Sequence, residues 1–282
     1  MNNSIGRVPY PKNESVQTYK KGSEERRALQ AALAEIASKQ IEIPLIIGGK
    51  EIKTTRTMDV VMPHDHQSIL ATCHLAGETE VNLAIEAAMA AKTIWQSLDW
   101  EQRAAIFLKA AQLIAGKYRY QLNAAAMLTT SKNVHQAEID AACELIDFLR
   151  FNVYFAQQIY EEQPLHSPSG IWNYITYRPL EGFVLAVAPF NFTAIAGNLA
   201  TSPAIMGNTV ILKPASTSVY TPYLVMQILK EAGLPDGVIN YLPGSGAMIG
   251  DHCLASPDLG GIHFTGSTGV FRGIWQTVGN NI

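Results

Sequence analysis

The chain has 282 residues, of which 48% are hydrophobic and only 16% are charged, and its formal net charge is −3. This length permits one large domain or two ordinary domains, in either case with an ample core. The charge balance provides no basic surface for nucleic acid, and no apolar run approaches the roughly 20 residues that span a bilayer.

The N-terminus and the cysteines bear on the cellular compartment. The first residues, MNNSIGRVPYPKNE, lack the apolar segment of a secretory signal and carry an acid, which transit peptides usually avoid. Cys73, Cys143 and Cys253 are widely spaced without a CxxC pair, so they predict neither a disulfide framework nor a zinc site. We therefore expect a reducing cytoplasm, or the mitochondrial matrix in a eukaryote, and no metal.

The N-terminal region combines a surface segment with a helix and short strands. Residues 1–22 are polar and contain proline, so we expect them to wrap a surface rather than form a core. Ser23 is a candidate N-cap for a helix with acids in its first turn. Short strands are expected at residues 43–47, 59–62 and 69–75. His64 and His66 lie in a loop between strands, and solvated side chains are favoured over half of a metal site because no third ligand is near.

Helical periodicity covers residues 78–160, and the last helix of this region carries four acids. At 100° per residue, Asp140, Glu144 and Asp147 fall together as a solvated stripe, whereas Glu138 falls on the opposite, apolar side. A carboxylate on an apolar side is costly unless it is paired or functional. From spacing alone, the favoured interpretation of Glu138 is a first-turn acid that faces the helix dipole and turns out to water.

Residues 163–182 interrupt the helical pattern with a proline- and glycine-containing turn followed by alternating aromatic and β-branched residues. Trp172, Tyr174 and Tyr177 belong to this alternation. It predicts an antiparallel strand or hairpin inserted before the next unit. Exposed aromatic side chains on an extended hairpin are typical of a subunit interface.

Residues 183–214 predict a parallel βαβ unit, because two buried strands flank a helix of small residues. Asn191 follows the first strand and Lys213 ends the second, at the sheet edge where ligands bind. Strands and helices continue to alternate up to residue 282. The predicted fold class is therefore α/β, with a Rossmann-like parallel sheet and flanking helices.

Glycine-rich turns follow two of the later strands. The turn at Gly244 and Gly246 reads GxGxxxG with Gly250, which misses the dinucleotide fingerprint by one position. The turn at Thr265–Ser267 is a better phosphate candidate, because backbone N–H groups and the Ser267 hydroxyl would face an anion at a helix N-terminus. Each turn alone is more simply a tight βα connection that needs glycine. Together with Lys213, they favour a dinucleotide groove.

The two polar residues of the βαβ unit have functional and ordinary interpretations. The Asn191 amide suits the stabilisation of a developing oxyanion, although a turn asparagine bonded to its own backbone is common. Lys213 suits a ribose hydroxyl or a phosphate, although a solvated lysine at a strand end is the alternative.

The succession APFNFT, ILKPAS, PGSG and HFTGST resembles the aldehyde dehydrogenase superfamily, and the resemblance covers the whole chain. It implies a discontinuous NAD-binding domain formed by residues 1–162 and 183–282, with an N-terminal extension at 1–40. Residues 163–182 would be an oligomerisation or bridging hairpin, and the catalytic domain would be absent from this chain. HQAEIDAACELIDFLRFN and EAGLPDGVINYLP are similar to the members that oxidise glutamate γ-semialdehyde in proline catabolism.

The resemblance also implies a role for individual residues. Asn191 would donate to the oxyanion, Phe192 would pack on the aliphatic part of the substrate, and Glu138 would lie near the aldehyde. The cofactor residues would be Lys213 at the ribose, Gly246 on the adenine side, Ser267 at the pyrophosphate, and Ser216. Many members have glutamate at the position of Ser216, so its absence leaves room for NADP beside NAD.

The nucleophilic cysteine and general-base glutamate of the superfamily have no counterparts here, and none of the three cysteines lies in the right context. We therefore expect these 282 residues to be inactive alone, within an enzyme that forms a homodimer or larger homo-oligomer. One alternative is an enzyme for another semialdehyde. The other is a non-catalytic nucleotide-binding or assembly module, if the chain ends at Ile282.

Overall fold

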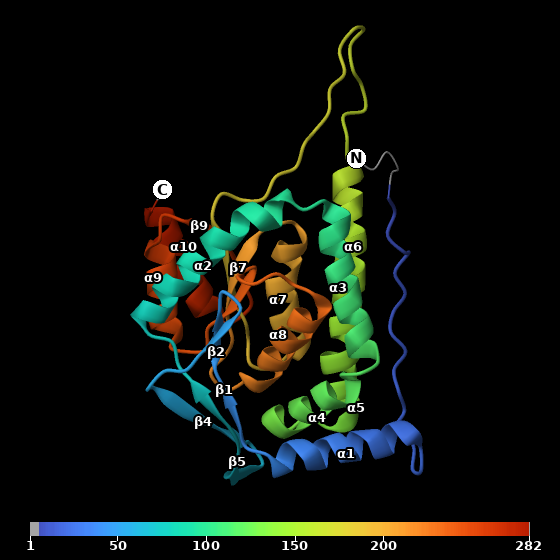
Figure 1. Cartoon of the computed structure of the whole chain (residues 1–282), viewed down its shortest axis with the longest axis vertical. Coiled ribbons are helices and arrows are strands. Elements are labelled where there is room, and N and C mark those ends of the chain that lie inside the picture. Colours follow the sequence, from blue (N-terminus) through green and yellow to red (C-terminus); the bar gives the residue numbers. More distant parts are fainter. Residues whose placement is uncertain (1–5, 282) are drawn as a thin grey trace.

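The computed structural model describes residues 6–281, which form helices around two sheets (Figure 1). The helices, in chain order, are α1 (Glu24–Ser38), α2 (Glu78–Ser97), α3 (Trp100–Ala115), α4 (Arg119–Thr130), α5 (Val134–Ala137), the π-helix η1 (Glu138–Glu144), α6 (Leu145–Glu161), α7 (Thr193–Ile205), α8 (Tyr220–Ala232), α9 (Gly246–Ala255) and α10 (Thr268–Asn280). The strands are β1 (Ile41–Ile43), β2 (Leu45–Ile47), β3 (Lys50–Ile52), β4 (Thr57–Met62), β5 (Asp65–His74), β6 (Phe183–Val187), β7 (Thr209–Lys213), β8 (Ile239–Tyr241) and β9 (Leu259–Phe264).

The larger sheet has six strands in the order β3-β2-β8-β7-β6-β9. Strands β8, β7, β6 and β9 are parallel, and the β2–β3 hairpin joins the β8 edge antiparallel. The chain therefore runs outward from β6 through β7 to β8 and then returns to the other side of β6. This is the Rossmann-like order, so the predicted fold class is confirmed.

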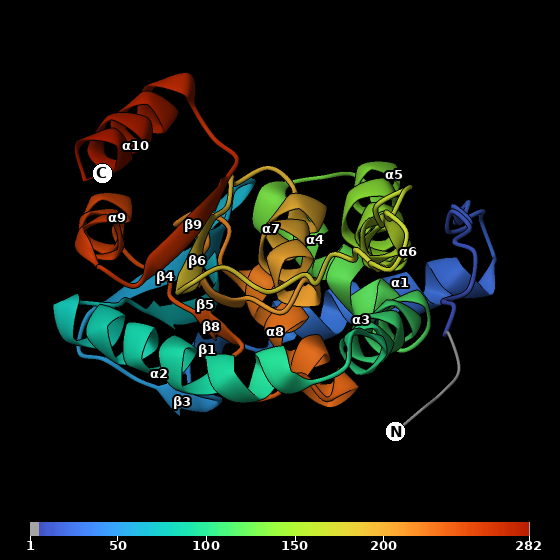
Figure 2. The same cartoon turned by 90° about the horizontal axis from the view of Figure 1, so that it is seen from above.

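Alternate residues of the parallel strands face two layers of helices (Figure 2). Val184 and Val210 belong to the main core with α7 and α8, whereas Phe183 and Ile211 pack with residues of α2 and α9. Such burial on both sides explains why these strands read as continuous apolar runs. Because helices cover both faces of the parallel strands, a ligand can approach them at their ends.

Pro44 divides the strand that was expected at residues 43–47. Ile43 and the rest of β1 pair with β5 in a three-stranded sheet, while β2 pairs with β3 and β8 in the large one. Proline cannot donate to a ladder, so the chain changes sheets there. The strands expected at 59–62 and 69–75 are present with longer bounds, and Ser23 caps α1 by accepting from the Arg26 N–H.

Residues 163–182 protrude from the body of the molecule after α6 and then return to it, where the Leu180 N–H donates to Asn208 Oδ1 (Figure 1). No strand is assigned anywhere in this range, so the predicted β-hairpin is wrong in its hydrogen bonding. Side chains replace the ladder: Gln163 Oε1 accepts from the Ile175 N–H at 2.9 Å, and Ser167 Oγ accepts from the Asn173 N–H at 3.0 Å. Trp172 is 85% exposed.

Candidate functional site

The reversal of strand order places a crevice at the carboxyl ends of β6 and β9. Ligands of open α/β sheets bind at such a reversal, because the helices on its two sides diverge there. A groove of about 560 Å³ lies at this point. Lys213, Gly246 and Ser267, which come from three separate strand–helix connections, all line it.

Lys213 is held at the wall of this groove with 9% of its surface exposed. Burial lowers the pKa of its ammonium group. Within residues 6–281, no carboxylate lies in ion-pair distance of Lys213. A Cβ atom at Gly246 would lie 3.5 Å from Lys213 Nζ, so glycine leaves space beside the amine. The arrangement is a partly desolvated cationic donor next to an open backbone.

Ser267 is the N-cap of α10, and its Oγ accepts from the Val270 N–H at 3.3 Å. Thr265 and Gly266 also line the groove, so the positive end of the α10 dipole faces it. This geometry suits a phosphate. Ser216 is exposed and lies one residue beyond Ala215, which does line the groove.

The turn between β6 and α7 lies between two grooves. The one just described is called the cofactor groove here, after the dinucleotide groove that the sequence predicts, and the other is called the second groove. Phe190 lines the cofactor groove, whereas Phe192 lines the second groove, which has a volume of about 800 Å³. Asn191 is the exposed residue between them. Asn191 is therefore next in sequence to one lining residue of each groove.

The second groove runs beside η1 and α6 and has aromatic walls. Phe148, Phe151 and Phe192 line it together with the carboxylate of Glu144. Burial, followed by the nearby charge of Asp140, raises the pKa of Glu144. Sequence spacing assigned Glu144 to a solvated stripe, and the structure corrects this by placing it in the groove.

Asp140 was expected in the same solvated stripe but is only 1% exposed. Its carboxylate accepts from the Thr193 and Ala194 N–H groups, each at 3.0 Å, at the N-terminus of α7. Lys132 Nζ lies 2.5 Å from Asp140 Oδ2 and 4.5 Å from the centroid of the Phe192 ring. Asp140 and Lys132 therefore fix the turn that carries the two site residues Asn191 and Phe192.

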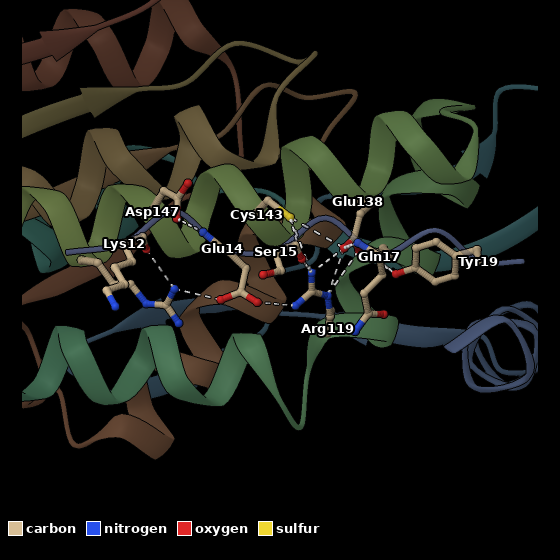
Figure 3. A network of polar contacts seen from close by, with 11 residues as sticks. Lys12, Glu14, Ser15, Gln17, Tyr19, Arg119, Glu138, Cys143 and Asp147 are labelled. Atoms are coloured by element: carbon tan, nitrogen blue, oxygen red, sulfur yellow. Dashed lines mark hydrogen bonds and ion pairs between the residues drawn. The ribbon is translucent and has the colours of Figure 1, made fainter. Parts of the chain in front are cut away.

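The structure also corrects both expectations for Glu138, because this side chain reaches neither water nor the groove. It is 0% exposed, and its carboxylate accepts from Arg119, the Tyr19 hydroxyl at 2.6 Å and the Gln17 N–H at 2.8 Å (Figure 3). Burial raises its pKa, but the hydrogen bonds from Arg119 and Tyr19 outweigh this and lower it overall. Glu138 is thus the anchor of a buried network.

The cysteines and histidines contribute no nucleophile or metal centre to the described part of the chain. Cys73, Cys143 and Cys253 are buried, and burial raises the pKa of each thiol to about 12. Across residues 6–281 no group of three potential metal ligands occurs. His64 instead bonds the Ser131 hydroxyl at 2.8 Å.

The strand order and the groove at its reversal define the class of this protein, a doubly wound α/β fold of the dinucleotide-binding type. The chain belongs to the aldehyde dehydrogenase family, which it matches over residues 51–282. It is 49% identical to "Delta-1-pyrroline-5-carboxylate dehydrogenase, mitochondrial" of Dictyostelium discoideum, over 98% of this chain and 49% of that protein. The human protein of the same name is 44% identical over 96% of this chain and 48% of its own length.

Solved structures agree with these sequence relatives. The Delta-pyrroline-5-carboxylate dehydrogenase from Mycobacterium tuberculosis bound with NAD has a TM-score of 0.97 and 53% identity, over 99% of this chain and 52% of that one. The 1-pyrroline-5-carboxylate dehydrogenase from Thermus with bound NAD has a TM-score of 0.89 and 34% identity, over 96% and 52% of the two chains. The present chain thus spans about half the length of the relatives it matches.

Among the residues assigned from the sequence, Lys213, Gly246 and Ser267 meet in one groove, and Phe192 lines the other. The sequence analysis did not identify most of the residues that line the second groove, or the residues that hold those lining residues in place. Lys132 and Arg119 had no signal of their own, because their partners are distant in sequence. Glu144 was recognised as a charge, but its surroundings depend on how α6 packs.

None of the helices within residues 6–281 combines the length and the apolarity that a membrane crossing requires.

Proposed function

We propose that this chain is the NAD-binding part of an aldehyde dehydrogenase that oxidises glutamate γ-semialdehyde, the open form of 1-pyrroline-5-carboxylate, to glutamate. The observation that carries the proposal is the position of Asn191 between a groove containing Lys213 and a groove containing Phe192. The names of the relatives supply the substrate class, because both curated relatives cited above share this activity in their names.

Three residues of the cofactor groove fit NAD. Lys213 would hydrogen-bond the adenosine ribose, Gly246 would admit the adenine side, and Ser267 with the α10 N-terminus would face the pyrophosphate. When bound, NAD supplies the hydride acceptor of the reaction. The low exposure of Lys213 supports this role, because a desolvated ammonium gains more from a ribose hydroxyl than a solvated one does.

The second groove is the proposed aldehyde side. Asn191 would donate its amide N–H to the aldehyde oxygen as negative charge develops there, and Phe192 would pack on the aliphatic carbons. Asp140 and Lys132 would hold both residues in place through the N-terminus of α7. Glu144 replaces Glu138 as the acidic residue that we place beside the substrate.

We also propose the remaining architecture. Residues 1–162 and 183–282 form one discontinuous cofactor domain, which is supported by a main core drawn from both segments. The exposed aromatic residues of 163–182 would meet a second copy of the chain in a homodimer or larger assembly. The three free, buried cysteines fit a reducing compartment, the cytoplasm or the mitochondrial matrix.

Calorimetric titration of NAD into the purified chain tests the cofactor groove without requiring turnover. Lys213→Ala should weaken NAD binding by about tenfold, which corresponds to roughly 1.4 kcal/mol, because it removes a charged donor. Lys92→Ala, on α2 outside the groove, is the matched control and should bind NAD like the wild type, because Lys92 donates to Gln96 of its own helix. Equal affinities for Lys213→Ala and the wild type would count against the groove.

The substrate is tested in the full-length enzyme that carries this chain. The value of kcat/KM for glutamate γ-semialdehyde should exceed the value for succinic semialdehyde, which is one carbon shorter and lacks the α-amino group. The opposite order would assign the enzyme to a different semialdehyde.

A further inference from the structure

Residues 6–22 form an extended segment, here called the N-terminal strap, that runs beside α6 before α1 begins (Figure 1). No helix or strand is assigned within residues 6–22. Its backbone groups must therefore find partners outside the segment, or remain in water. The strap lies outside residues 51–282, the part that matches the family as a whole.

Side chains of α6 hold the middle of the strap. Asp147 accepts from the Glu14 N–H and from Asn13 Nδ2, each at 2.7 Å. The Glu14 carboxylate lies 2.8 Å from Arg150 Nη1 and 2.8 Å from Arg119 Nη1. The strap is thereby attached to two separate helices at a single residue.

The buried side chains of Arg119 and Glu138 hold the next stretch of the strap (Figure 3). Arg119, only 3% exposed, donates to the Ser15 carbonyl at 2.6 Å and pairs with Glu138. Glu138 in turn accepts from the Gln17 N–H and the Tyr19 hydroxyl. These contacts pair backbone groups of Glu14, Ser15 and Gln17, and they fix the course of the strap past Arg119 and Glu138.

This course brings the strap to the second groove. Asn13, Glu14 and Val16 line the groove along with Phe148 and Phe192. Val16 is 45% exposed and is the apolar strap residue of this wall. Its aliphatic side chain faces the same cavity as the Phe192 ring, which we assigned to the aliphatic part of the substrate.

We infer that the N-terminal strap is a specificity-determining wall of the aldehyde groove, with Val16 limiting the width available to the substrate. Glu138 and Arg119 are positioning residues that hold this wall. The inference rests on the proposed function, and it assigns substrate selection partly to a segment outside the region shared by the whole family.

Full-length enzyme with Val16→Trp tests the wall directly. The larger side chain should reduce kcat/KM for glutamate γ-semialdehyde by about tenfold or more, mainly through the aldehyde KM, because it fills a shape-selective pocket. The KM for NAD should not change. Val16→Ala should widen the groove and shift relative kcat/KM towards bulkier aldehydes.

Thr18→Trp is the matched control, because threonine has nearly the shape of valine and Thr18 is an exposed residue of the same strap outside the groove. Its kinetics should equal those of the wild type. If Val16→Trp and Thr18→Trp behave alike and Val16→Ala leaves the aldehyde preference unchanged, the strap is no specificity wall. A wild-type enzyme that does not oxidise the semialdehyde would instead overturn the proposed function, and the strap inference with it.

Discussion

Glu138 and Asp140 are two residues apart in η1, which continues directly into α6. Their carboxylates bind different neighbours of this continuous helix. Glu138 faces Arg119 and the N-terminal strap, whereas Asp140 faces the N-terminus of α7. Both side chains are essentially unexposed, so both carboxylates need hydrogen-bond partners within the protein. The neighbours of Glu138 give it a measurable effect on stability.

The pH dependence of stability tests the Glu138 network. Its pKa is lowered in the folded state, so its stabilising effect is present above the ordinary value of 4.5 and is lost as the pH falls through the folded value. Glu138→Gln should lower the free energy of unfolding at pH 7 by about 3 kcal/mol, because Arg119 then loses a buried partner. The deficit should shrink below pH 4.5, because there the unfolded wild-type chain takes up a proton at this carboxylate that the folded protein does not yet bind.

Denaturant titrations at neutral and acidic pH measure this deficit. Glu35→Gln is the control, because Glu35 pairs with Lys39 on an exposed surface of α1 and should change stability little. A deficit of the same size at both pH values would show that the loss comes from packing rather than from charge.

A second prediction at the residue scale concerns Ser216 and the choice between NAD and NADP. Its exposed side chain offers no carboxylate to grip the ribose hydroxyls or to repel a 2′-phosphate. Ser216→Glu should therefore weaken NADP relative to NAD by about tenfold, roughly 1.4 kcal/mol, in calorimetric titrations. Ser216→Ala should leave the ratio unchanged, and an equal loss for both cofactors in Ser216→Glu would remove this residue from the ribose site.

Elements were predictable from the sequence where their signals are local. The Ser23 N-cap, the helices between residues 78 and 160 and the βαβ unit at 183–214 all depend on short-range periodicity or capping, and the structure contains them. The same helical wheel correctly placed Glu138 on the buried side of its helix. The helical wheel could not predict that the strap, Arg119 and α7 cover this helix, because they are distant from it in the sequence.

Two elements were mispredicted for identifiable physical reasons. The strand at 43–47 was treated as continuous although Pro44, which lacks a donor, sends its halves to different sheets. Residues 163–182 have the alternation of a strand, but no partner strand within residues 6–281 pairs with them. Alternation of side-chain types indicates which residues of a strand could share a face. A β-ladder additionally requires a second strand that accepts and donates the backbone hydrogen bonds.

The exposed segment 163–182 carries a prediction about assembly. Trp172 and Tyr174 are 85% and 66% exposed, and such aromatic side chains gain most by burial against a second copy. Trp172→Glu should lower the average mass of the particle in light scattering coupled to gel filtration. Ile94→Glu, at a similarly exposed apolar position on α2, should not. An unchanged mass for Trp172→Glu would place the interface elsewhere.

At the scale of the whole molecule, the sequence indicated more of the residues that line the cofactor groove than of those that line the second groove. Lys213, Gly246 and Ser267 each end or follow a strand of one parallel sheet, so topology alone brings them together. The second groove combines the strap, η1–α6 and Phe192, which no strand order connects. The residues that line it could therefore not be predicted without knowing how these elements pack together.

The chain by itself should bind NAD without oxidising an aldehyde. Oxidation by this family's chemistry requires a thiolate, and burial raises the pKa of Cys73, Cys143 and Cys253 to about 12, so all three remain thiols at neutral pH. Purified residues 1–282 should thus bind NAD in calorimetry but form no NADH with glutamate γ-semialdehyde. NADH formation above the level of a Cys73→Ser, Cys143→Ser, Cys253→Ser triple variant would identify one of these thiols as a nucleophile. NADH formed equally by both proteins would mean that this chain supports turnover without a cysteine.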